Sequence, residues 1–117
     1  MQEQLRALIE RHCLTLVSEA AAVRACLARL ADPAADRAAV VAEGTGLAHK
    51  IKGSSGSIGF GEISQAAQAL EFYLRELARL EGALDEAQVG RAIGLGRDLE
   101  ARTAAIRPEN SALYDAV

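Results

Sequence analysis

The sequence of 117 residues is poor in aromatic and sulfur-containing side chains. Aromatic residues make up 3% of it, Trp is absent, and there are only two Cys and two Pro. Cys13 and Cys26 fall in one expected helix, where a rise of about 1.5 Å per residue separates them by roughly 20 Å. That separation is too large for a disulfide bond or a shared metal ion. We therefore expect two small, half-buried thiols.

Three further absences limit the classes of function that the chain can have. The net charge is −3 and no tract of Lys and Arg is available to follow a nucleic-acid backbone. No apolar run approaches the roughly 18 residues that a membrane-spanning helix needs, and the first residues do not resemble a signal peptide. We expect a monomeric cytoplasmic protein that binds neither nucleic acid nor membrane.

What the chain has in abundance is alanine and leucine, and these residues favour helices that pack closely on one another. Hydrophobic residues make up 50% of the sequence, which is enough for one core. Apolar residues recur at helical spacings in four segments, at about residues 2–30, 33–57, 61–80 and 86–107. The expected core positions are Leu5, Ile9, Leu16, Ala20, Val23, Leu27, Leu30, Val40, Leu47, Ile51, Ile58, Ile63, Ala66 or Ala67, Leu70, Leu74, Leu77, Val89, Ile93, Gly96, Leu99 and Ile106.

The ends of these segments carry recognisable signals. Asp32 and Asp85 are expected to cap the second and fourth helices, and Pro108 to end the last one. The sequence predicts an all-α fold, an antiparallel up-down-up-down four-helix bundle over residues 1–107. A short C-terminal tail of uncertain order, residues 108–117, would follow it.

Three glycines fall inside the fourth expected helix, at Gly90, Gly94 and Gly96. Glycine is costly in a helix interior, so each position needs a reason. Close approach to a neighbouring helix is the simpler interpretation, and a self-association surface is the alternative.

His49 is the most informative residue, because it points away from the expected core. With about 100° between successive residues, Val40, Ile51 and Ile58 lie on the opposite side of the helix. The residues on the same face as His49 are Ala42, Thr45, Gly46, Lys52, Gly53 and Gly56. These side chains are small apart from Lys52, so a partner could approach the imidazole closely.

The chemistry of this face suits phosphoryl transfer. An imidazole is a nitrogen nucleophile that is partly neutral near pH 7, and attack on an activated phosphoryl group would give a phosphohistidine. Lys52, one turn after His49, would offset the phosphoryl charge. Lys50 lies about 100° around the helix from His49, and we expect it to contact a docking partner or to be a solvated charge. On helical periodicity alone, a solvated histidine without chemical function remains the alternative.

A resemblance to histidine-containing phosphotransfer domains rests on residues 48–59, which read AHKIKGSSGSIG. The family pattern is Ala-His, any residue, an aliphatic residue, Lys-Gly-Ser, a small residue and a later Gly. The matching positions are Ala48, His49, Ile51, Lys52, Gly53, Ser54, Ser55 and Gly59. On the next helix, Ile63, Leu70 and Glu71 match an aliphatic position and a Leu-Glu pair. The resemblance is specific over about residues 47–71.

This resemblance implies a reaction and its partners. Proteins of the family are four-helix bundles that carry phosphate between the aspartates of receiver domains, in response regulators and hybrid histidine kinases. By this likeness His49 would be the phosphoacceptor and Lys52 would stabilise the phosphoryl group. The receiver domain would supply Mg²⁺, so the chain would need no cofactor of its own. The candidate partner-docking residues are Thr45, Gly46, Lys50, Gly53 and Gly56.

The resemblance also implies a role for Glu71. In the related phosphotransfer domain of chemotaxis kinases, a glutamate on the next helix orients the histidine, and Glu71 occupies the matching position. A solvated residue on the helix surface is the alternative. Ser54 and Ser55 are expected to bond the helix backbone rather than to take part in chemistry.

Four other functions are alternatives for this chain. The dimerisation helix of a sensor kinase usually has an acidic residue after its histidine, whereas this chain has Lys50. Nothing resembles an ATP-binding domain, so the chain should not phosphorylate itself from ATP. The phosphotransfer domain of a chemotaxis-type kinase and a non-catalytic helical adaptor remain open alternatives. A metal site is disfavoured, because His12 and His49 lie on different helices without paired ligand spacing.

Overall fold

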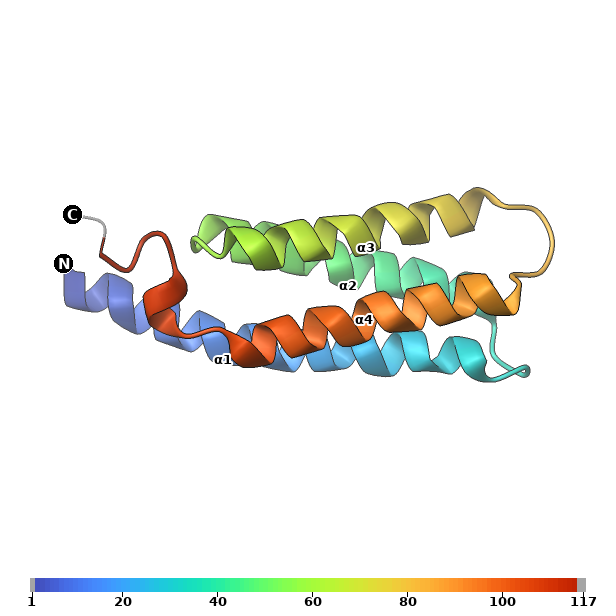
Figure 1. Cartoon of the computed structure of the whole chain (residues 1–117), viewed down its shortest axis with the longest axis horizontal. Helices are drawn as coiled ribbons and strands as arrows, with labels where there is room; N and C mark the ends of the chain where they lie inside the picture. Colours follow the sequence, from blue (N-terminus) through green and yellow to red (C-terminus); the bar gives the residue numbers. More distant parts are fainter. Residues whose placement is uncertain (1, 116–117) are drawn as a thin grey trace.

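The computed structural model describes residues 2–115 and contains four long antiparallel helices (Figure 1). They are α1 (Gln2–Ala28), α2 (Arg37–Ser57), α3 (Gly61–Arg79) and α4 (Glu86–Ala105), with the short 3₁₀ helices η1 (Arg29–Ala31) and η2 (Pro108–Asn110). No strand occurs within residues 2–115, so the expected all-α up-down-up-down bundle is confirmed. Met1, Ala116 and Val117, which the sequence assigned to the bundle and the tail, lie outside the described residues.

The bundle is elongated, with extents of 53 × 20 × 18 Å. α1 packs against α2 and α4, and α3 packs against the same two helices, so α1 and α3 lie diagonally across the bundle. Figure 1 shows both chain ends at the end of the bundle where α2 turns into α3.

The start of α2 differs from the prediction. Asp36, and not Asp32, caps this helix by accepting a hydrogen bond from the Ala39 amide at 3.1 Å. The Asp32 carboxylate instead accepts from the Ala34 amide at 2.9 Å, which holds the chain in a turn. The second helix therefore begins at Arg37 rather than at residue 33, because the carboxylate of Asp32 is used in a local turn.

The other helix ends agree with the prediction within a few residues. α1 loses its α-helical hydrogen bonding after Ala28 and continues as η1, two residues before the expected end at Leu30. Asp85 caps α4 in a capping box with Gln88, in which each side chain bonds the other residue's amide.

The core is formed by the apolar positions that the helical spacing indicated. The fully or nearly fully buried ones are Ile9, Leu16, Ala20, Val23, Leu27, Leu30, Val40, Ile51, Ile58, Ile63, Ala67, Leu70, Leu74, Leu77, Val89 and Leu99. The expected core residues Leu5, Leu47, Ala66, Ile93 and Ile106 are only partly buried and pack against its edge. Cys26 is buried as well, and burial raises the pKa of its thiol to about 11.

The glycines of α4 divide into two kinds. A Cβ at Gly96 would lie 2.9 Å from Leu27 of α1, so this position does allow close approach of two helices. Gly90 and Gly94 are exposed, and a Cβ at either would meet nothing within 4 Å. The close-packing prediction is therefore wrong for these two, which lie on the solvent side of the helix.

The segment after α4 folds back onto the α2–α3 turn. The Ser111 hydroxyl donates to the Ile58 carbonyl at 2.6 Å, and the Ala112 amide donates to the Gly59 carbonyl at 2.9 Å. The guanidinium of Arg6 lies 4.4 Å from the ring centre of Tyr114. The C-terminal segment thus joins the end of α2 to the start of α1.

None of the helices within residues 2–115 is both long enough and apolar enough to cross a membrane.

Candidate functional site

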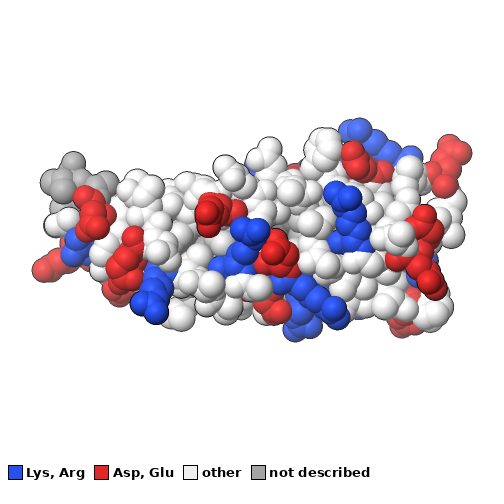
Figure 2. Space-filling model, viewed as in Figure 1, with Lys and Arg blue, Asp and Glu red and all other residues white. Residues whose placement is uncertain are grey.

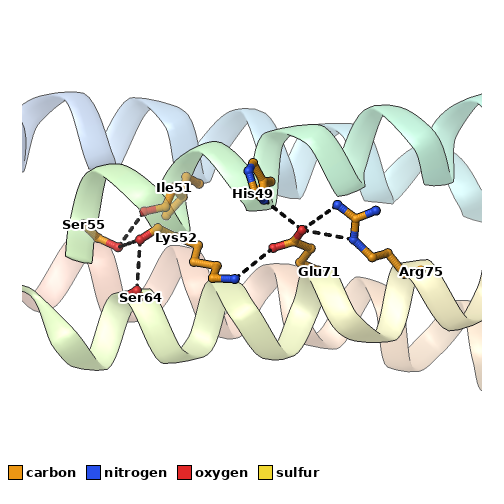
Figure 3. A network of polar contacts seen from close by, with 7 residues as sticks. All are labelled: His49, Ile51, Lys52, Ser55, Ser64, Glu71 and Arg75. Carbon is orange, nitrogen blue, oxygen red and sulfur yellow. Dashed lines mark hydrogen bonds and ion pairs between the residues drawn. The ribbon is translucent and has the colours of Figure 1, made fainter. Parts of the chain in front are cut away.

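His49 lies in the middle of α2 and points out of the bundle beside α3 (Figure 3). Its side chain is 65% exposed, whereas its neighbours Ala48 and Ile51 are fully buried. The predicted orientation of the histidine, away from the core, is confirmed.

Glu71 of α3 holds the imidazole in one orientation. The Nδ1 atom of His49 is 2.9 Å from Oε2 of Glu71, whose side chain is only 8% exposed. An ionised carboxylate can only accept a hydrogen bond, so Nδ1 carries a proton and donates it. The lone pair of the neutral imidazole is then on Nε2, the nitrogen on the other side of the ring. The structure therefore favours the orienting role of Glu71 over that of a solvated helix residue.

Arg75, one turn after Glu71, fixes the same oxygen. Its Nη2 and Nε atoms donate to Oε2 of Glu71 at 2.7 and 3.1 Å. The ion pair is of the i,i+4 kind within one helix, and the guanidinium is half exposed. Arg75 therefore compensates the carboxylate charge and fixes the rotamer that reaches His49 (Figure 3).

Lys52 approaches the other oxygen of the same carboxylate. Its Nζ atom is 3.9 Å from Oε1 of Glu71, an ion-pair distance that is too long for a hydrogen bond. Within the described part of the chain, Oε1 has no hydrogen-bond partner. Lys52 is thus near the histidine and is not held by a hydrogen bond to the carboxylate, so its ammonium group can move toward an added anion.

Opposing effects act on the ionisation of Glu71. Burial would raise its pKa, but the hydrogen bonds from Arg75 and His49, together with the electrostatic effect of these two groups, outweigh burial and lower the pKa. Glu71 is therefore an anion at neutral pH, which agrees with its role as acceptor from Nδ1.

Serine side chains fix the backbone at the end of α2. The Ser55 hydroxyl donates to the Ile51 carbonyl at 2.6 Å, and the Ser54 hydroxyl reaches the same carbonyl at 3.4 Å. This confirms the expectation that both bond the helix backbone. Ser64 of α3 donates to the Lys52 carbonyl at 2.9 Å, so the turn that carries Lys52 is bound to the neighbouring helix.

The small residues around His49 leave its surroundings open. A Cβ added at Gly46 or Gly53 would meet nothing within 4 Å, and both positions are exposed. Gly56 is exposed too, but a Cβ there would lie 3.2 Å from the Ser64 hydroxyl, so its small size also permits the approach of α3. Gly44 faces inward, where a Cβ would lie 3.0 Å from Leu27.

The two polar docking candidates lie on either side of the histidine in sequence. Lys50 is exposed. Thr45 is half-buried, and its hydroxyl donates to the Val41 carbonyl at 2.7 Å. Its side chain also borders a shallow groove that contains Arg75. Their role in docking remains a prediction.

Arg75 and Ser64 contribute to the site around His49, and neither of them was predicted from the sequence. The spacing of Glu71 and Arg75 is a visible signal, but i,i+4 pairs of opposite charge are common on solvated helix faces. Only the structure shows that the carboxylate of this pair is buried against α2 and reaches a histidine.

The face shown in Figure 2 carries acidic and basic side chains that are interspersed along the bundle, without a continuous basic track. Among the described residues, no three His, Cys, Asp or Glu side chains are grouped closely enough to hold a metal ion. The carboxylate beside His49 is already engaged by Arg75.

A family model described as "Hpt domain" matches residues 2–107 of the chain. Comparison with curated proteins and with solved structures gave no significant match. The matched region contains the four long helices, Glu71 and the three residues whose side chains approach its carboxylate, His49, Lys52 and Arg75.

Proposed function

The chain belongs to the Hpt domain family, and on that premise we propose that His49 is its phosphoacceptor. The family has a histidine phosphotransfer role in phosphorelays. In our proposal, His49 takes a phosphoryl group from the aspartate of one receiver domain and passes it to the aspartate of another response regulator. The observation that carries the proposal is the hydrogen bond between Nδ1 of His49 and the buried carboxylate of Glu71.

The proposed reaction follows from this hydrogen bond. The lone pair on Nε2 attacks the phosphorus atom of an aspartyl phosphate, an N–P bond forms, and the P–O bond to the aspartate breaks. The aspartate leaves as a carboxylate. The imidazole keeps its Nδ1 proton and becomes positively charged, and the anionic Glu71 stabilises that charge at 2.9 Å. Transfer to the next aspartate reverses these steps.

Lys52 has a separate task in this proposal. Its ammonium group would move the short distance from Glu71 toward the phosphoryl oxygens and stabilise their negative charge in the transition state. The carboxylate beside His49 is already bound by Arg75, so the donor set of this site does not suit a divalent cation. We propose that the receiver domain holds the Mg²⁺ that neutralises phosphoryl charge in the transfer.

The test uses a receiver domain charged with radiolabelled phosphate as donor. Wild-type chain should acquire label, and His49→Gln should acquire none. His12→Gln is the matched control, because it removes the other histidine of the chain, which lies on α1, and it should be labelled like wild type. Equal labelling of His49→Gln and wild type would refute the proposal, and would leave the non-catalytic adaptor as the better description.

Lys52→Ala tests the second role. We expect transfer from the charged receiver to slow by at least about tenfold, while the thermal stability stays close to that of wild type. An unchanged rate would remove Lys52 from the mechanism.

A second candidate function is favoured by the same hydrogen bond. A glutamate that orients the histidine is what the resemblance to the phosphotransfer domain of chemotaxis-type kinases implies, and Glu71 makes that contact. Such a domain receives its phosphate from a kinase domain that binds ATP, and not from a receiver. Labelling by a chemotaxis kinase domain with ATP, combined with no labelling by charged receivers, would support this second function. Labelling of the isolated chain by ATP alone would contradict both.

A further inference from the structure

Phe72 is an aromatic residue without a structural role inside the bundle. The chain has two Phe and two Tyr. Phe60 is buried, and Tyr73 and Tyr114 each stack against an arginine. Phe72, in contrast, is 66% exposed. An exposed ring contributes little to folding, so Phe72 is free to contact a partner.

The position of Phe72 places it at the phosphotransfer site. It follows Glu71 directly on α3 and borders the small groove, about 160 Å³, that Lys52 and Arg75 also line. On its other side it borders a larger groove of about 470 Å³ between α3 and α4. Phe72 therefore borders two grooves. The smaller one is lined by Lys52 and Arg75, which lie close to the histidine.

The charges in the smaller groove beside Phe72 indicate what kind of partner fits there, whereas the larger groove carries one charge of each sign, Glu76 and Arg91. Lys52 and Arg75 are both partly exposed and cationic, whereas the carboxylate between them is buried. A partner that brings an anionic aspartyl phosphate to His49 would meet both cations and the phenyl ring at once. Aromatic side chains and arginines are enriched among the residues that dominate binding energy at protein interfaces.

A second copy of this chain fits the surface less well. In a two-fold symmetric dimer through Phe72, the same patch would face itself, and the two sets of Lys52 and Arg75 would lie opposite one another. Like charges placed across an interface oppose association. Charge complementarity thus favours a partner that is acidic at the point of contact.

We propose that Phe72 is the apolar anchor on which the receiver domain docks, with Lys52 and Arg75 meeting the anionic side of that domain. The inference rests on the proposed function, because it assumes that His49 exchanges phosphate with a receiver. Docking on Phe72 would contribute to the affinity of the complex in which the partner's aspartate meets His49.

The test compares Phe72→Ala with Leu14→Ala. Leu14 is 75% exposed on α1 and lines neither of the two grooves that Phe72 borders, so Leu14→Ala is a matched loss of exposed apolar area outside the proposed docking surface. Single-turnover transfer is measured against the concentration of a receiver domain that phosphorylates the wild-type chain. For Phe72→Ala the half-saturating concentration should rise at least about tenfold, while the limiting rate stays within about twofold.

The controls separate docking from folding. Ala is the better helix former, so Phe72→Ala should unfold at or above the wild-type temperature. Phe72→Leu, which keeps an apolar side chain, should recover most of the affinity, and Leu14→Ala should match wild type. A half-saturating concentration unchanged in Phe72→Ala, an equal rise in Leu14→Ala, or a loss confined to the limiting rate would each overturn the proposal.

The labelling experiments distinguish a loss of the docking role of Phe72 from a failure of the proposed function. If charged receivers label neither the wild-type chain nor its variants, the proposed function fails and the docking role fails with it. If wild type and Phe72→Ala are labelled with the same concentration dependence, only the docking role of Phe72 is refuted. A Phe72→Ala variant that loses self-association in sedimentation but keeps its affinity for the receiver would assign the ring to a second copy instead.

Discussion

At the scale of single residues, one carboxylate determines the chemistry of the site. Glu71 accepts from His49 and from Arg75 on the same oxygen, and Lys52 approaches its other oxygen. The arginine neutralises the buried anion, and the anion fixes the tautomer of the histidine. Glu71 and Arg75 are in this sense positioning residues, and His49 and Lys52 are the groups that would contact the phosphoryl group.

Replacing Glu71 tests this division of roles. In Glu71→Gln the amide can either accept from Nδ1 or donate to it, so the histidine should become a mixture of tautomers. We expect transfer to slow by roughly 10- to 100-fold, as for other residues that orient a functional histidine. The ¹⁵N chemical shifts of the imidazole should show protonated Nδ1 in wild type and a mixture in the variant. An unchanged tautomer would show that Glu71 does not set it.

The sequence predicted His49 as the acceptor and its outward orientation, and the structure confirms the orientation. The full network of contacts around the histidine was not predicted. His49 could be placed because Val40, Ile51 and Ile58 lie opposite it on the helix and because a specific motif surrounds the histidine. The orienting role of Glu71 was predicted from a family position alone. The sequence could not exclude a solvated residue, because it does not show that the Glu71 side chain is buried. The contribution of Arg75 depends on how α2 and α3 approach each other, which no local pattern encodes.

At the scale of secondary-structure elements, the cap of α2 decides where this helix starts. Asp36 caps the helix and Asp32 makes a local turn, although both are followed by residues that can enter a helix. Sequence signals for helix starts therefore identified the segment and missed its first residue, because two aspartates compete within a few positions.

A pair of substitutions separates the two aspartates. Asp36→Ala leaves the first-turn amide of Ala39 without its side-chain acceptor and should lower the free energy of unfolding by about 1 kcal/mol. Asp32→Ala affects only the preceding turn and should cost less. Urea denaturation of both variants measures the difference, and a larger loss for Asp32→Ala would contradict the assignment of the cap.

At the scale of the whole molecule, the C-terminal segment closes the end of the bundle. Residues after α4 reach back to Ile58 and Gly59, beyond the end of the helix that carries His49. The sequence predicted a tail of uncertain order, since this stretch lacks helical periodicity. The position of this segment depends on hydrogen bonds between residues far apart in the chain, and local sequence patterns do not predict such contacts.

Gly59 is the residue at which this closure can be tested. It has a φ of 90°, and a Cβ at this position would lie 2.6 Å from the Ser111 hydroxyl oxygen and 3.0 Å from the Ala112 amide nitrogen. Gly59→Ala should therefore destabilise the protein by about 1–3 kcal/mol and speed hydrogen exchange at the Ala112 amide. Gly82→Ala is the matched control, because Gly82 has a similar φ but open surroundings, and it should cost less. Equal effects of the two substitutions would show that the C-terminal contact contributes nothing.

The position of the phosphoryl group on the phosphorylated chain tests the central claim most directly. Labelling the chain with ¹⁵N and charging it from a phosphorylated receiver allows the N–P coupling to be observed by NMR. The hydrogen bond from Nδ1 to Glu71 leaves Nε2 as the nucleophile, so the phosphorus should couple to Nε2 of His49 while Nδ1 keeps its proton. Phosphorus on Nδ1, or on any residue other than His49, would contradict the account.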